Sequence, residues 1–178
     1  MKYLIASDIH GSAYYTERLI ERFRAENADK LVLLGDIYNH GPRNPLPEEF
    51  NEMKVAGILN GMKKDLIVVK GNCDSQVDTL ISEFDFIDSL VIESAGKTVF
   101  CTHGHIYNKD NPPKTKFDAV IYGHFHTGFI VKEGETAFIN AGSVSLPKCD
   151  FSHSYLVLDG EKVTLKDIDG KTLDSIEL

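Results

Sequence analysis

Short apolar runs and amphipathic segments alternate through the first part of the chain. Residues 4–6, 31–34 and 66–69 are continuous apolar runs, a pattern typical of strands that are buried on both faces of a sheet. The two segments between them have apolar residues at helical spacing. Ser12 is a good N-cap for the first predicted helix, and the second covers residues 50–62. Strands separated by helices indicate crossover units, which place consecutive strands parallel in one sheet.

After residue 76 the pattern changes to paired strand segments. Such segments flank Gly96-Lys97, Gly134-Glu135 and Asp159-Gly160, which predicts three hairpins. A further apolar strand covers residues 119–122, and residues 171–176 are expected to form a closing edge strand. We therefore expect an α/β fold (α+β in some schemes): a four-layer α-β-β-α sandwich of two packed mixed sheets flanked by helices, in a single domain over residues 1–178.

Composition and charge narrow the classes of function. Apolar residues make up 42% and charged residues 26% of the chain, which excludes disordered, collagen-like and coiled-coil proteins. The net charge of −8 disfavours an extended nucleic-acid surface or binding to anionic lipid, because such surfaces are basic. No apolar run approaches the roughly 20 residues that cross a bilayer. The polar residues Asp8 and His10 come too early for a signal peptide, and three widely spaced cysteines suggest no disulfide framework. We expect a cytoplasmic protein.

Polar side chains follow five of the predicted strands, each beside a glycine. They are Asp8 with His10, Asp36, Asn72, His103, and His124 with His126. Because the carboxyl ends of parallel strands meet at one edge of a sheet, we expect these seven side chains to converge. A single such residue is more often a cap or a solvated side chain, but five coincidences favour a metal site. The glycines act either as turn formers or as a source of space beside the ions.

The number and type of these side chains indicate the metals. Seven ligands exceed the four that one zinc ion usually takes, and they suit two ions that share a carboxylate. The mixture of carboxylate, amide oxygen and imidazole favours Mn²⁺, with Fe²⁺ or Zn²⁺ as alternatives, over Ca²⁺ and Mg²⁺. The sequence therefore predicts a site for two divalent metal ions.

These residues resemble the signature of the metallophosphoesterase (calcineurin-like) superfamily. The matching motifs, over residues 4 to about 147, are Asp8-x-His10, Gly35-Asp36, Gly71-Asn72, His103 and Gly123-His124-x-His126. Three further segments narrow the resemblance to small bacterial phosphodiesterases of the YfcE type. They are Gly41-Pro42-Arg43-Asn44, Gly71-Asn72-Cys73-Asp74 and residues 140–147.

The resemblance implies a set of roles and a reaction. One metal would be held by Asp8, His10, Asp36 and His126, and the other by Asp36, Asn72, His103 and His124. Asp36 would then bridge the two ions. A hydroxide held between them would attack the phosphorus of a small-molecule phosphodiester, in line with the leaving oxygen and without a covalent intermediate.

The chain departs from the wider family in two places. Many members have a histidine where this chain has Cys73. Because a cysteine thiol is a weak hydrogen-bond donor, we expect poor hydrolysis of simple monoesters. Alternatively, Cys73 only fills space. The usual phosphate-binding arginine is missing from residues 35–41, and His40 or Arg43 could replace it or be ordinary surface residues. Asp74 is expected to orient a histidine or metal-bound water, or to cap a helix. His105 is expected to be solvated, and His153 is given no role.

Two other functions are compatible with the sequence. A phosphomonoesterase or protein phosphatase is disfavoured by Cys73 and by the missing arginine. A protein-interaction scaffold is the second alternative, since the retromer contains a subunit of this fold, but retention of all seven ligand positions disfavours it. The physiological substrate is not identified by the sequence, and exposed hairpins could pair subunits into a homo-oligomer.

Overall fold

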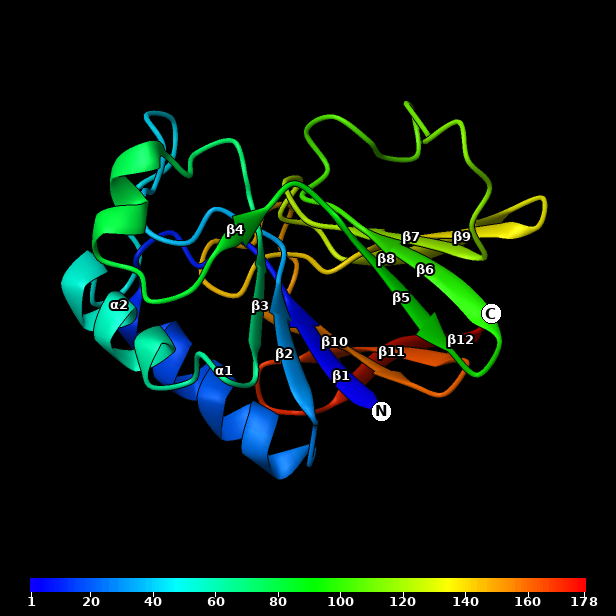
Figure 1. The fold of residues 1–178 in the computed structure, drawn as a ribbon, viewed down its shortest axis with the longest axis horizontal. Helices are drawn as coiled ribbons and strands as arrows, with labels where there is room; N and C mark the ends of the chain where they lie inside the picture. The colour runs from blue at the N-terminus through cyan, green and yellow to red at the C-terminus, as the bar shows by residue number, and fades with distance from the viewer.

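The computed structural model describes all residues 1–178, and its strands form two mixed sheets that pack face to face (Figure 1). The larger sheet has seven strands in the order β12-β11-β10-β1-β2-β3-β4. These strands are β1 (Lys2–Ala6), β2 (Lys30–Leu33), β3 (Leu66–Val69), β4 (Phe86–Ile87), β10 (Ser154–Asp159), β11 (Lys162–Asp167) and β12 (Thr172–Glu177). The first four are parallel, as the crossover pattern predicts for β1 to β3.

The smaller sheet has five strands in the order β5-β6-β7-β9-β8. They are β5 (Leu90–Ser94), β6 (Lys97–Cys101), β7 (Ala119–Tyr122), β8 (Phe129–Glu133) and β9 (Thr136–Asn140). The strands β6, β7 and β9 are parallel. The core between the sheets is aliphatic, with Ile5 and Val32 of the larger sheet and Ile121 and Ile139 of the smaller one fully buried in it. The predicted fold of two packed mixed sheets is confirmed.

The helices cover the outer face of the larger sheet (Figure 1). Helix α1 (Ala13–Ala25) begins after Ser12, whose side chain accepts a hydrogen bond from the Tyr15 N–H, so the predicted N-cap is confirmed. Helix α2 (Glu52–Asn60) is shorter than predicted because its N-cap is Asn51 and Gly61 ends it. A short 3₁₀ helix, η1 (Gln76–Leu80), and strand β4 were not predicted, because neither contains enough residues to show a periodicity.

A loop, rather than a helix, covers the outer face of the smaller sheet. Residues 102–118, the yellow-green loop in Figure 1, connect β6 to β7. Phe117 of this loop stacks on Phe100 with ring centroids 4.9 Å apart, and it packs with Val120, Tyr122 and neighbouring aromatic residues. The apolar face of this sheet is therefore buried by aromatic loop residues in the place of a second helical layer.

The three predicted hairpins are present, but two of their turns are displaced by one residue. The first turn is Ala95-Gly96, because Ser94 pairs with Lys97. Both turn residues have positive φ, 49° and 79°, as a type I′ turn requires, and an alanine gives no sign of this in the sequence. The third turn is Gly160-Glu161, since Asp159 pairs with Lys162.

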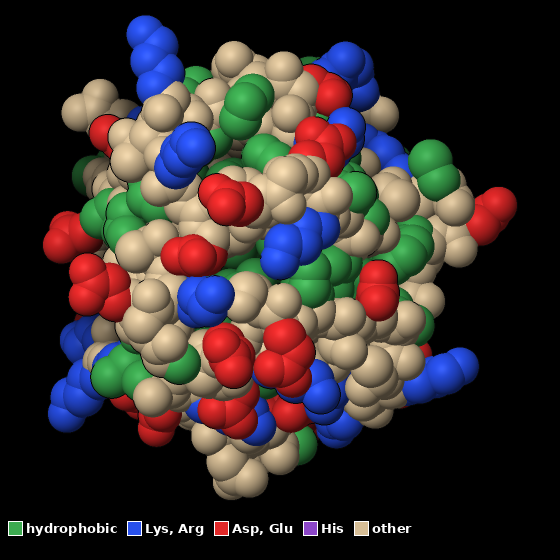
Figure 2. Space-filling model, turned by 90° about the vertical axis from the view of Figure 1, so that its right-hand side faces the viewer, with side chains coloured by type: hydrophobic (Ala, Val, Ile, Leu, Met, Phe, Trp, Pro, Cys, Tyr) green, Lys and Arg blue, Asp and Glu red, His purple; other side chains and the backbone are tan.

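The face at the right-hand side of Figure 1 carries charges of both signs. Figure 2 shows acidic and basic side chains interspersed there among apolar ones, with no histidine in view.

With 13 residues in α1 and 9 in α2, neither α-helix is long and apolar enough to cross a membrane.

Candidate metal centre

The candidate ligands lie where the two sheets present the carboxyl ends of their strands. Asp8, Asp36 and Asn72 follow β1, β2 and β3 of the larger sheet, whereas His103 and His124 follow β6 and β7 of the smaller one. The sequence places these ends along one rim, and the structure shows that the rim is shared by two packed sheets. The strands at the edges of the two sheets contribute none of the seven residues.

The backbone turns sharply at most of the candidate ligands. Five of them have positive φ between 51° and 65°: Asp8, His10, Asp36, His124 and His126. Positive φ is uncommon for residues other than glycine, and such strained residues cluster at functional sites.

Three histidines are held in the same tautomer by backbone carbonyl groups. The Nδ1 atoms of His10, His103 and His126 lie 2.7, 2.7 and 2.6 Å from the carbonyl oxygens of Asn39, Leu34 and Leu146. A carbonyl oxygen can only accept, so each Nδ1 carries the hydrogen and donates it. In the neutral form of each ring, Nε2 is therefore left with a lone pair that can bind a cation.

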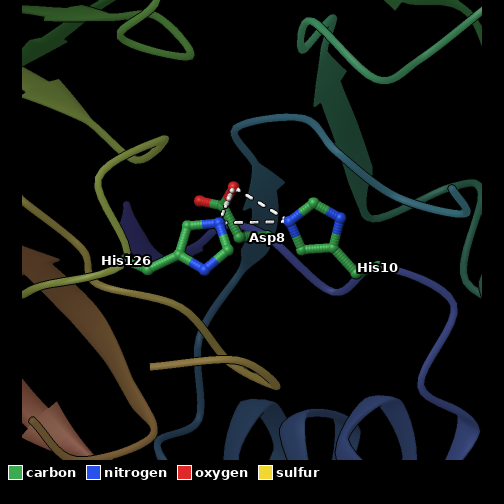
Figure 3. A group of neighbouring side chains, drawn as sticks. All are labelled: Asp8, His10 and His126. Atoms are coloured by element: carbon green, nitrogen blue, oxygen red, sulfur yellow. Dashed lines mark hydrogen bonds and ion pairs between the residues drawn. The ribbon is translucent and has the colours of Figure 1, made fainter. Parts of the chain in front are cut away.

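Asp8, His10 and His126, here called the first lobe, bring their electron-donating atoms together (Figure 3). The Oδ1 atom of Asp8 lies 3.2 Å from Nε2 of His126 and 3.5 Å from Nε2 of His10, and the two Nε2 atoms are 3.2 Å apart. The Asp8 Oδ1 atom is buried and has no hydrogen-bond partner. Three lone-pair atoms without a shared hydrogen form an arrangement that a cation stabilises.

Asn72, His103 and His124, the second lobe, lie on the other side of Asp36. A single oxygen of Asp36, Oδ2, is 3.8 Å from Nε2 of His10 and 3.5 Å from Nε2 of His103, so it faces both lobes. The amide oxygen of Asn72 is 3.0 Å from the same His103 nitrogen. His124 places its ring 5.2 Å from that of His103, and its backbone N–H donates to Asp8 Oδ2.

Mutual charge dominates the electrostatics of these buried groups. Burial by itself lowers the pKa of His103, but the carboxylates of Asp36 and Asp8 outweigh it and raise this pKa to about 9. Burial by itself raises the pKa of Asp8, yet His10 and His126 hold it well below its ordinary value. The carboxylates therefore stay ionised, and positive charge is favoured between them.

Asp74 fixes the backbone at Asp36 and forms no hydrogen bond with a histidine. Its carboxylate accepts hydrogen bonds from the N–H groups of Asp36, Ile37 and Gly71 at 2.8, 2.8 and 2.7 Å. These bonds join the loop after β2 to the loop after β3. Burial, opposed by these bonds, raises the pKa of Asp74. Its position supports a positioning role, which differs from both of the roles expected from the sequence.

Two glycines permit the close approach of the loops. A Cβ on Gly71 would lie 2.2 Å from Asp36 Oδ1, and one on Gly123 would lie 1.9 Å from Ser7 Oγ. The glycines were expected either to form turns or to leave space. At Gly71 and Gly123 the second explanation applies, because a side chain would collide with the neighbouring loop.

The loop after β9 supports the first lobe, and most of its residues were given no role from the sequence. The hydroxyl groups of Ser143 and Ser145 donate to the Asp8 carbonyl oxygen at 2.8 and 3.0 Å. His153 donates from Nδ1 to the Val144 carbonyl and accepts from the Tyr15 hydroxyl. The only sequence signal for the two serines was the segment 140–147, which carries resemblance but no ligand, and nothing in the sequence pointed to His153.

A polar cleft of about 610 Å³ opens beside both lobes. Its lining comprises Asp36, Asn39, Gly41, Pro42, Arg43, Asn44, Asn72, Cys73, His124, His126 and Lys148. Burial, reinforced by Asp36, raises the pKa of the Cys73 thiol to about 12, so this group is neutral. Arg43 lies in the cleft, whereas His40 packs edge-on against Phe50 outside the lining. His105 is exposed and lies beside His103. Lys148 lines the cleft but was not predicted as a site residue from the sequence.

The fold and this donor set are those of a metal-dependent phosphoesterase. Residues 1–162 match the calcineurin-like phosphoesterase superfamily domain, and the chain belongs to this superfamily. The chain is 41% identical over 169 residues to phosphodiesterase YfcE of Escherichia coli strain K12, covering 93% of this chain and 91% of that protein. It is 27% identical over 190 residues to the probable metallophosphoesterase YsnB of Bacillus subtilis strain 168, covering 99% and 97%.

Solved structures show the same relationship. The structure of YfcE, a phosphoesterase from E. coli, superposes with a TM-score of 0.95 at 38% identity, covering 99% of both chains. Vps29 of Entamoeba histolytica, in a complex with Zn²⁺, shares the fold with a TM-score of 0.65 at 18% identity, covering 99% of both chains. The predicted family is confirmed, and with it the assignment of the chain to the metallophosphoesterases.

Proposed function

We propose that the protein is a phosphodiesterase that uses two divalent metal ions to hydrolyse a small-molecule phosphodiester. The observation that carries the proposal is the convergence of imidazole Nε2 lone pairs on buried carboxylate oxygens, with Asp8 Oδ1 lacking any partner. Nitrogen and oxygen donors together suit Mn²⁺ best, and Fe²⁺ or Zn²⁺ are alternatives.

The donor set divides into two overlapping groups. The first ion would be held by Asp8, His10, Asp36 and His126, and the second by Asp36, Asn72, His103 and His124. The position of Asp36 Oδ2 between His10 and His103 supports its role as the shared ligand. Two such ions would supply a hydroxide for in-line attack on phosphorus and would offset the charge of the phosphoryl oxygens.

The remaining site residues act on the substrate or on the ligands. Arg43 lines the cleft and is proposed to bind an anionic group of the substrate, and the Asn72 amide is proposed to bind a phosphoryl oxygen. Asp74 is proposed to hold the Asp36 backbone in place. His40 stays a candidate for phosphate binding, although its ring is engaged with Phe50. The neutral thiol of Cys73 would give little help to a leaving group of high pKa, which favours diesters and activated esters.

Further properties are proposed on narrower grounds. The match over residues 1–162, and the pairing of β12 with β11 in the same sheet, support a single metallophosphoesterase domain over residues 1–178. The three cysteines are free thiols, which supports a reducing cytoplasm as the location. A homo-oligomer stays a prediction.

Metal reconstitution tests the proposed function. Purified protein is stripped with a chelator, analysed for metal, and titrated with Mn²⁺, Fe²⁺ or Zn²⁺. We expect about two ions per chain and hydrolysis of bis(p-nitrophenyl) phosphate only in the loaded protein. His126→Ala should lose activity, whereas Asp88→Asn, an exposed residue outside the donor set, should still bind two ions. A protein that takes up no metal and cleaves neither diesters nor monoesters would instead be a scaffold.

A further inference from the structure

Arg43 and Lys148 line the cleft from two loops that both support the first lobe. Arg43 lies in the loop after β2 and Lys148 in the loop after β9. The first loop orients His10 through the Asn39 carbonyl, and the second orients His126 through the Leu146 carbonyl. These two histidines stand on either side of Asp8 (Figure 3), so the two loops reach the first lobe through different ligands.

Neither cation is neutralised by the protein. The chain has 27 acidic and 19 basic residues, and eight of the basic side chains lie within 4 Å of a carboxylate. Arg43 and Lys148 form no such pair. The cleft lining contains a single carboxylate, Asp36, which faces the histidines and accepts a hydrogen bond from the Cys73 N–H. Two positive charges are therefore available to a ligand on an acidic protein.

The rest of the lining describes what kind of ligand fits. The side chains of Asn39 and Asn44 offer amide groups, and Gly41 and Pro42 leave space. The only aromatic rings are the imidazoles of His124 and His126, which belong to the proposed metal ligands. A nucleobase would find no aromatic face on which to stack, so recognition depends on charge and hydrogen bonds.

We propose that Arg43 and Lys148 form a subsite for a second anionic group, a carboxylate or phosphate carried by one alcohol of the diester. This inference rests on the proposed function and deepens it. The scissile phosphate would be held at the two metal positions, and the second anion would be bound beside the first lobe. The substrate is thus a small polar phosphodiester with an additional negative charge.

A matched pair of substrates tests the subsite. p-Nitrophenyl 2-carboxyethyl phosphate and p-nitrophenyl propyl phosphate have chains of similar size, and only the first carries the second anion. We expect the Mn²⁺-loaded protein to favour the carboxylated diester by about tenfold in kcat/KM, through a lower KM, since a charged hydrogen bond contributes at least that factor. The preference should weaken as salt is added.

Variants assign the preference to the two side chains. Lys148→Gln and Arg43→Gln should each reduce the ratio of kcat/KM between the two diesters several-fold, and the double variant should abolish it. Lys148→Arg keeps the charge and should keep the ratio. Lys132→Gln is the matched control, because Lys132 is an exposed lysine on β8 outside the cleft lining.

Equilibrium binding separates this inference from the proposed function. Isothermal titration calorimetry of the Mn²⁺-loaded protein compares 2-carboxyethylphosphonate with propylphosphonate, neither of which can be hydrolysed as an ester. Tighter binding of the carboxylated compound, lost in the double variant, supports the subsite even if neither diester is cleaved. The proposal is overturned if the two compounds bind with equal affinity, or if neither binds measurably. It is also overturned if the preference survives in the double variant.

Discussion

The Nε2 atoms of His10 and His126 lie 3.2 Å apart, and in the neutral form of both rings neither nitrogen carries a hydrogen that could join them. Each ring donates its Nδ1–H to a backbone carbonyl, of Asn39 for His10 and of Leu146 for His126. Two lone pairs at this distance repel each other unless a cation or a proton lies between them.

Metal binding should stabilise the fold. A ligand that binds only the folded state at 100 times its Kd adds about 2.7 kcal/mol, or about 5–10 °C in Tm for a domain of this size. Differential scanning calorimetry with Mn²⁺ and with chelator measures this shift. Asp8→Asn should remove most of it, and an identical Tm with and without chelator in the unaltered protein would contradict a metal site.

Metal affinity should increase with pH. The pKa of His103 is raised to about 9, because Asp36 and Asp8 outweigh the opposing effect of burial, and the ring must lose this proton to coordinate. Protons therefore compete with metal below pH 9, and occupancy should fall steeply below roughly pH 6, where imidazole ordinarily protonates. Calorimetric titration in buffers of different ionisation enthalpy should show proton release. Affinity that is constant from pH 5 to 8 would argue against histidine ligands.

The space at Gly71 should be essential for the Asp36 ligand. In Gly71→Ala the new Cβ would lie 2.2 Å from Asp36 Oδ1 and 2.4 Å from its backbone nitrogen, so the carboxylate must move. We expect a loss of metal affinity and a destabilisation of about 1–3 kcal/mol.

The matched control for this substitution is Gly57→Ala, in helix α2. A Cβ on Gly57 has no neighbour within 4 Å, so this change should stabilise the fold by about 0.4–1 kcal/mol and leave metal binding intact. Chemical denaturation and metal titration measure both effects. If both variants behave alike, the close approach at Gly71 has no functional role.

Removing the charge of Asp74 should loosen the link between two ligand loops. Asparagine at this position offers one acceptor oxygen and presents an NH₂ group to the three N–H donors of Asp36, Ile37 and Gly71. We expect a loss of about 3 kcal/mol in the free energy of unfolding, since bonds to a charged group contribute about 1.5–3 kcal/mol each. The exposed Asp88→Asn serves as the control. A change within about 0.5 kcal/mol would show that these bonds do not stabilise the site.

Introducing a histidine at Cys73 should change the preference for the leaving group. Cys73 lines the cleft with its sulfur 3.3 Å from the Asn72 amide nitrogen, so an imidazole there would reach the ester. Cys73→His should increase kcat/KM for p-nitrophenyl phosphate relative to the diester on the order of tenfold or more, because it can donate a proton. Cys149→Ser, outside the cleft, is the control. Unchanged rates for both substrates would leave Cys73 a space-filling residue.

Much of the fold could be predicted because its elements are defined locally. Apolar runs such as residues 31–34 and 66–69 match buried parallel strands, and the Ser12 cap matches the start of α1. The two-residue strand β4 could not be predicted, because it is defined by its pairing with β3 and by tertiary packing rather than by a local pattern. The loop over the smaller sheet could not be predicted either, since Phe117 finds its position through contact with Phe100.

The sequence by itself determined the identity of the candidate ligands and the family, because ligand chemistry and its spacing reside in residue types. Only the tertiary structure decided how the ligands meet. The positive φ angles at Asp8 and Asp36 exist because surrounding loops impose them, at an energetic cost that no local propensity would predict. The position of Lys148 beside the cleft depends on the packing of the two sheets, since β9 belongs to the smaller sheet and β1 to the larger one.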